Sequence, residues 1–168
     1  MFFRQMLLAA PLALAAAAAG ADPVTIEQID LETLQNFDSE PVVVNDGDDS
    51  PLARIVQIDP TGAASNSVSL YVDGQSNGLS ASTSLPEQAS ALGLESGGIE
   101  QFGQDNLLRL VIEGEQNAFS VVQHGVGNSV TAQVLGQQNS LAAVQSGSFN
   151  VIDVIQNGQG NSAFVLQR

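Results

Sequence analysis

An eleven-residue repeat runs through the last third of the chain without interruption. Asparagine returns every eleven residues, at Asn106, Asn117, Asn128, Asn139, Asn150 and Asn161. Glycine follows eight residues after the first five, at Gly114, Gly125, Gly136, Gly147 and Gly158, and glutamine follows six residues after four of the six, at Gln123, Gln145, Gln156 and Gln167. A short fixed period of this kind indicates stacked, quasi-one-dimensional repeats.

Each unit alternates like a β-strand over its first seven residues. One face carries two mainly apolar residues between two amides, as in Asn117, Phe119, Val121 and Gln123. The remaining four residues include the glycine, which accepts a positive φ and favours a tight turn. We therefore predict an all-β fold, a β-solenoid of strand-turn-strand coils. Two eleven-residue units form each coil, and strands of successive coils lie about 4.8 Å apart.

The amides predict ladders along the stack. Coils of two units place Asn106, Asn128 and Asn150 in one column, and Asn117, Asn139 and Asn161 in another. Stacked carboxamides both donate and accept hydrogen bonds. Each such bond contributes about 1 kcal/mol net, whereas a buried amide without a partner costs about 1–3 kcal/mol. An uncovered end coil is therefore expected to favour the addition of another copy.

The two sides of the predicted solenoid differ in their glutamines. Gln123, Gln145 and Gln167 form a complete column. On the other side, Ile112 and Val134 take the glutamine positions, so the column of Gln156 is broken.

The segments 117–128 and 150–161 resemble the curlin repeat, the Gln-x-Gly-x-x-Asn-bearing unit of bacterial curli fibre subunits. The resemblance covers residues 106–168 and extends weakly to about Asn66. It implies a secreted subunit of a functional amyloid, a pilus-like extracellular fibre of the biofilm matrix that serves cell adhesion. The implied partners are the chain itself, other curlin-like subunits and an outer-membrane export pore, which the chain reaches through the periplasm.

Residues 1–21 have the composition of a secretory signal peptide. A single charge, Arg4, precedes an apolar run, and the segment ends in Ala19-Gly20-Ala21, which predicts cleavage after Ala21. A membrane anchor is disfavoured because the uninterrupted run after Pro11 is short and rich in alanine.

Residues 22–52 form an acidic leader without a basic residue, which predicts disorder. Two roles stay open: a solvating segment that delays polymerisation, or, by the resemblance, an address for the export pore. The run from Asn45 to Asp49 is interpreted as a solvated turn, because it lacks the spacing of a calcium loop.

Residues 53–105 are expected to form irregular solenoid units. Asn66 and Asn77 are eleven residues apart, but forty residues separate Asn66 from Asn106. Pro86 cannot donate to a strand ladder, so we place an insertion near 84–94. Regular repeats then occupy residues 106–168.

Glu95 is assigned to the asparagine position of the unit that contains Gln101 and Gly103. A buried carboxylate without a partner is costly, so this assignment predicts a frayed or terminal coil.

Composition argues against several functions. The chain has 4 basic and 18 acidic residues and a net charge of −14, which disfavours nucleic acid and anionic membranes. It has no cysteine, so disulfides cannot stabilise it. The single histidine, His124, is interpreted as a solvated turn residue, and the serines fall on outward, solvated strand positions (Ser120, Ser129, Ser140 and Ser162). We expect no enzyme activity, catalytic residue, metal, cofactor or small-molecule substrate.

A monomeric β-helical surface adhesin or binding protein is the alternative function, and it requires caps at both ends. For a fibre subunit, we expect growth at the C-terminal coil, with the acidic leader and the insertion blunting the other end. Edges that proteins protect are usually blocked by charge or proline, and Arg168 is the one charged residue near Gln167.

Overall fold

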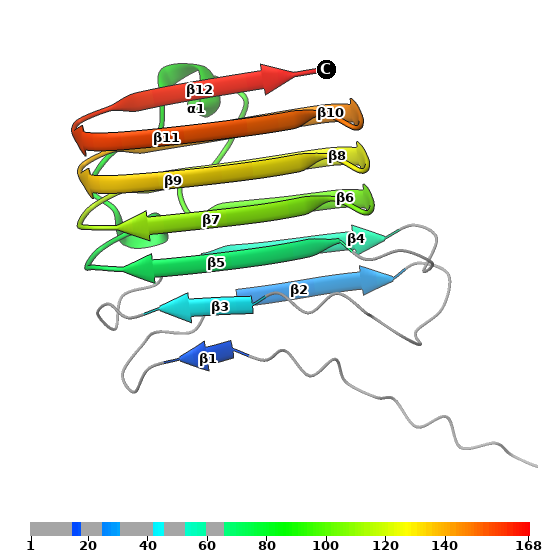
Figure 1. The fold of residues 1–168 in the computed structure, drawn as a ribbon, viewed down its shortest axis with the longest axis horizontal. Coiled ribbons are helices and arrows are strands. Elements are labelled where there is room, and N and C mark those ends of the chain that lie inside the picture. The colour runs from blue at the N-terminus through cyan, green and yellow to red at the C-terminus, as the bar shows by residue number, and fades with distance from the viewer. Residues whose placement is uncertain (1–14, 18–24, 31–41, 46–52, 60–65) are drawn as a thin grey trace, which may run out of the picture.

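The computed structural model of the chain is a β-solenoid built from two facing parallel sheets (Figure 1), which confirms the predicted fold class. It describes residues 15–17, 25–30, 42–45, 53–59 and 66–168. Most of the predicted signal peptide, much of the acidic leader and the expected turn at 46–49 lie outside the described residues.

Strands alternate between the two sheets along the chain. Sheet A contains, in order, β1 (Ala15–Ala17), β3 (Val42–Asn45), β5 (Ser67–Asp73), β7 (Leu107–Glu113), β9 (Ser129–Gln137) and β11 (Val151–Gln159). Sheet B contains β2 (Thr25–Asp30), β4 (Arg54–Asp59), β6 (Gly98–Gln104), β8 (Ala118–Val126), β10 (Ser140–Ser148) and β12 (Ser162–Gln167). Each coil therefore takes one strand from each sheet.

The register follows the predicted coil length. Ser140 in β10 pairs with Ala118 below and Ser162 above, so equivalent residues are 22 positions apart. In sheet A, Ser129 is similarly level with Leu107 and Val151. Identical positions of successive repeats therefore lie directly above one another.

The core lies between the sheets and consists of the apolar residues that alternate inward. Phe119, Val121, Leu108 and Leu110 are fully buried, and Ile152 in the upper sheet A strand is only 3% exposed. Burial of one such side chain contributes about 1.5–3 kcal/mol. The repeat thus stabilises each coil against both of its neighbours.

Two strands lie in the segment that the composition predicts to be disordered. β2 and β3 extend sheet B and sheet A beyond β4 and β5. The register of β2 places Ile26 level with Ile55 and Gln28 level with Gln57. A short strand needs only a few residues that match the edge beside it, and this local match outweighs the acidic composition.

The insertion lies at residues 79–96, which is wider than the predicted 84–94. Asn77 and Asn117 are 40 residues apart where the coil length is 22, a difference of 18. Gly78 N donates to Asn117 O, and Gly97 N donates to Phe119 O, so the chain leaves the coil after Gly78 and rejoins it at Gly97.

The assignment of Glu95 to an asparagine position is therefore wrong. Asn77 is the asparagine of this unit, because its Oδ1 accepts from Asn117, and Glu95 is an exposed residue of the insertion. The Ser96 hydroxyl donates to Gly78 O at 2.7 Å and closes the base of the insertion. The coil that carries the insertion is regular and is not frayed.

We call residues 79–96 the strap, because they lie across the outer face of sheet B. The strap carries part of the short helix η1 (Gly78–Ser80) and the whole of the helix α1 (Glu87–Ala91). Figure 1 shows α1 at the level of the C-terminal strands. Leu85 and Ala89 pack against Ala118 and Ala142, and Phe164 of β12 borders this cluster.

The strap overturns part of the expectation for the outward serines. Ser120 and Ser140 are only 2% and 4% exposed, because small residues on β8 and β10 form the floor under the strap. Ser129 is half-buried and Ser162 is exposed. The strap also lies on the side of the stack and near its C-terminal end, so it does not blunt the N-terminal end.

Candidate assembly surface

Two asparagine ladders run up the stack from Asn66 and Asn77 to its C-terminal end, one at each turn. In the first ladder, side-chain Nδ2 atoms donate from Asn106 to Asn66 Oδ1 (3.0 Å), from Asn128 to Asn106 (3.0 Å) and from Asn150 to Asn128 (3.1 Å). In the second, they donate from Asn117 to Asn77, from Asn139 to Asn117 and from Asn161 to Asn139, each at 3.1 Å. These columns are the ones that the repeat predicts, extended downward by one asparagine each.

Each ladder asparagine also satisfies backbone groups at the turn. Asn128 N donates to Asn106 Oδ1 at 3.2 Å, so this oxygen accepts two hydrogen bonds from the coil above. Asn128 Nδ2 also donates upward to Gly147 O at 3.0 Å. Because Oδ1 always faces the C-terminal side, the ladders have a direction.

A complete glutamine ladder lies inside sheet B. Nε2 donates to Oε1 of the next coil from Gln57 to Gln101 (2.8 Å), Gln101 to Gln123 (2.8 Å), Gln123 to Gln145 (2.9 Å) and Gln145 to Gln167 (3.1 Å). Gln57 was not predicted from the repeat, because it precedes Asn66 by nine residues whereas Gln101 precedes Asn106 by five. The signal for Gln57 is the alternation through β4 and the residue before it, where Ala53, Ile55 and Gln57 are all buried.

Gln156 has the broken column that the sequence predicts. Its register neighbour in the coil below is Val134, and Val134 in turn pairs with Ile112. Gln156 Nε2 donates to Ser140 O at 3.0 Å, but its buried Oε1 has no hydrogen-bond partner in the described structure. A buried acceptor without a partner costs about 1–3 kcal/mol, so Gln156 is expected to lower the stability of the free subunit.

The glycine after each glutamine position is required by the close approach of successive turns. Gly125 has φ +122°, and a Cβ there would overlap the carbonyl oxygen of Gly147 in the coil above. The same relation joins Gly114 to Gly136 and Gly136 to Gly158. At Gly158, by contrast, a Cβ would meet only Asn161 Nδ2 at 3.4 Å.

Strands β11 and β12 are the outer strands of the two sheets at the C-terminal end. Asn150 and Asn161 donate from Nδ2 to Ser146 O and Asn157 O, both at 3.1 Å, as Asn128 does to His124 O at 3.2 Å. Among the described residues, neither has a counterpart of the further bond from Asn128 to Gly147 O of the next coil. In the described part of the chain, no donor reaches Oδ1 of either residue. This end therefore presents two unfilled acceptors beside the two edge strands.

The same edge is apolar on its outer side. Val151 and Ile155 of β11 are 65% and 71% exposed, and Phe149 in the preceding turn is 78% exposed. Phe149 also has φ 59°, an uncommon conformation for a bulky residue, and its ring lies over Gly127 of the turn below. Exposed apolar residues beside open ladder groups are typical of an interaction surface.

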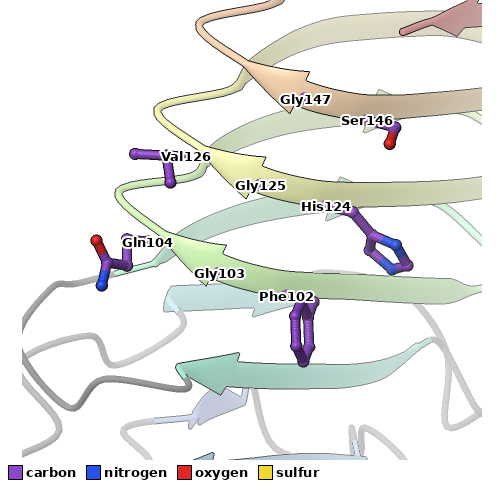
Figure 2. A pocket seen from close by; sticks show the side chains of 8 residues that line it. All are labelled: Phe102, Gly103, Gln104, His124, Gly125, Val126, Ser146 and Gly147. Carbon is purple, nitrogen blue, oxygen red and sulfur yellow. The ribbon is translucent and has the colours of Figure 1, made fainter.

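A groove follows the stack along the turn side of sheet B (Figure 2). Phe102, His124 and Ser146 form one wall, and the glycines of the turns form the floor. His124 lies in β8, not in a turn as expected, and its Nε2 is 3.1 Å from Glu100 Oε1. Its ring meets Phe102 edge to face at 5.8 Å. The groove is thus a consequence of the glycine column.

Within the described residues, no cluster of three or more metal-binding side chains occurs. The described helices are also too short and too polar to cross a bilayer. Comparison of the chain with protein families, curated proteins and solved structures finds no match.

Proposed function

We propose that this chain is a secreted structural subunit of a curli-like amyloid fibre and that it assembles end to end by continuing its coils. The observation that carries the proposal is the C-terminal edge of the described stack, where no donor among the described residues reaches the last asparagine of either ladder. An added coil would supply donors to Asn150 Oδ1 and Asn161 Oδ1 and pair the edges of β11 and β12.

The internal coils show how deeply the ladder asparagines are buried when a coil lies on both sides of them. Asn128 and Asn139 are fully buried between two coils, while Asn161 in the last coil is exposed. A parallel strand edge without proline and with little charge is a template for another strand, and Asp153 is the one charged residue within β11 and β12. Burial of the ladder amides and of the apolar edge residues then favours stacking over the free subunit.

Purified protein should form fibres with thioflavin T fluorescence after a lag, and preformed seeds should remove that lag. Oriented fibres should give reflections at about 4.8 Å and about 10 Å, the strand and sheet spacings. Protein that stays monomeric through long incubation with seeds would instead favour the capped surface adhesin.

Export to an extracellular fibre is part of the proposal and rests on residues 1–21 and on the curlin-like repeat. Immunogold labelling of intact cells should place the chain on fibres outside the cell. A chain without residues 1–21 should stay inside, and equal surface labelling of both chains would argue against the predicted signal peptide.

A further inference from the structure

We infer that the occupant of the C-terminal edge is the β2–β3 coil of a second copy, aligned in the register that the chain itself displays. The inference rests on the proposed end-to-end assembly and adds which strands meet, in which register, and what covers the partner coil beforehand.

The broken column of sheet A carries an amide at each of its ends. Pairing places Asn45 of β3 level with Val72, which is followed upward by Ile112, Val134 and Gln156. Three apolar residues therefore separate Asn45 from Gln156 within one chain. In a head-to-tail stack, Gln156 of one copy becomes the direct neighbour of Asn45 of the next, and the two amides meet.

The orientation of Gln156 suits this neighbour. Its Nε2 donates to Ser140 O as Gln145 Nε2 donates to Ser129 O, so the two side chains share one orientation. Gln145 Nε2 also donates to the glutamine of the coil above. The corresponding N–H of Gln156 is therefore directed beyond β11, where an amide oxygen can accept it and a valine cannot.

Sheet B has the same complementarity. The glutamine column begins at Gln28 of β2 and ends at Gln167 of β12, so stacking continues this ladder from one copy into the next. Neighbouring positions agree as well, because Val165 then meets Ile26 and Val154 meets Val43. A slip of one residue would place Gln156 beside Val44 or Asp46 and Gln167 beside Glu27 or Ile29. It would also move the apolar set to the wrong face.

Strand β1 occupies the position that the second copy needs. It pairs with β3 and sets Ala17 level with Asn45, where an alanine cannot complete an amide pair. β1 belongs to residues 1–21, the predicted signal peptide. Loss of this segment would expose β3 and make the N-terminal coil available to a C-terminal edge.

Cysteine cross-linking tests the register, because the chain has no cysteine of its own. Strands about 4.8 Å apart lie within the Cα separation that a disulfide requires. Four single variants, Asn45→Cys, Gln156→Cys, Gln28→Cys and Gln167→Cys, are made in chains that begin at Asp22. They are mixed in pairs, assembled and oxidised. We expect disulfide-linked dimers from Asn45→Cys with Gln156→Cys and from Gln28→Cys with Gln167→Cys.

The same four variants supply the controls when they are paired across sheets. Asn45→Cys with Gln167→Cys and Gln28→Cys with Gln156→Cys should give no dimers. Equal yields from all four mixtures, or fibres without any cross-link, would overturn the inference and leave end-to-end assembly standing. Failure of every mixture and of the unsubstituted chain to sediment as fibres would overturn both.

The role of β1 is tested in the full chain. Ala16→Pro removes a ladder donor from β1 and should displace it from β3. The yield of the Asn45–Gln156 cross-link should be low in full chains that keep Ala16, because β1 covers β3, and should rise in full chains with Ala16→Pro. Equal yields would show that β1 does not cover the docking coil.

Discussion

Asn77 Oδ1 accepts hydrogen bonds from both the backbone nitrogen (2.9 Å) and the side-chain Nδ2 (3.1 Å) of Asn117, although 40 residues separate the two. Two asparagines of successive coils in the regular array, Asn117 and Asn139, make the same pair of contacts over 22 residues. The strap is therefore an addition to a continuous solenoid, and its removal leaves a complete repeat.

Deletion of residues 79–96, which joins Gly78 to Gly97, should preserve the fold. The joined segment places Gln101, Gly103 and Asn106 six, eight and eleven residues after Asn77, as in the regular units. We expect an unchanged β-sheet circular-dichroism spectrum and a free energy of unfolding lower by about 2 kcal/mol, because Ala118 and Ala142 lose their cover. A chain that no longer folds would show that the strap is needed for the coil itself.

A glutamine inside the ladder and the lone glutamine should respond oppositely to truncation. Gln145→Ala removes the side chain that accepts from Gln123 Nε2 and donates to Gln167 Oε1. The free energy of unfolding, measured by denaturant titration, should fall by about 1–3 kcal/mol. Gln156→Val removes a buried acceptor that has no partner among the described residues and continues the column of Val134, so the free energy of unfolding of the monomer should stay level or rise. Equal losses in the two variants would contradict the ladder assignment.

The regular units were predictable because each repeats the same chemistry at a fixed spacing. The columns of Asn106 and Asn117 followed from period alone, and so did the break at Gln156. The unit that begins at Asn77 was misread, because an insertion hides the relation between Asn77 and Gln101 from any fixed-period reading.

Two further features depend on long-range contacts that composition does not record. The strap covers Ser120 and Ser140, so these serines are buried although their outward strand positions predicted exposure to solvent. β2 pairs with an edge that already exists, and Gln28 and Gln57 become neighbours although 29 residues separate them. Neither relation leaves a local signal.

Glycines at the middle and at the end of the stack should differ in what an alanine does. Gly125→Ala adds a Cβ that overlaps Gly147 O, whereas Gly158→Ala meets no backbone of the coil above among the described residues. Both carry the strain of φ near +120°, about 1–3 kcal/mol. Gly125→Ala should therefore unfold at a clearly lower denaturant concentration than Gly158→Ala. If assembly adds a coil above β11, Gly158→Ala should nevertheless abolish seeded growth.

The hold of the strap on the last coil is measurable by hydrogen exchange. Ala89 of α1 is fully buried in the cluster that includes Ala142 and borders Phe164, whereas Ala91 of the same helix is exposed. Ala89→Asp buries a charge and should release the strap, so β12 amides should exchange faster than in the unsubstituted monomer. Ala91→Asp is the matched control and should leave exchange unchanged. Equal β12 protection in both variants would mean that the strap does not stabilise the last coil.

Growth at the C-terminal edge predicts a separation between folding and elongation. Asn161 and Gln167 each bond to one neighbouring coil, through Asn139 and Gln145, so the double variant Asn161→Ala, Gln167→Ala should lower the free energy of unfolding by only about 1–2 kcal/mol. The same change removes the groups that an incoming coil would bond, so seeded elongation should slow strongly. Asp153→Ala with Asn157→Ala alters exposed outward positions of the same coil and should elongate normally. Elongation rates are measured from equal numbers of seeds. If the two double variants elongate at the same rate, growth takes place at another surface.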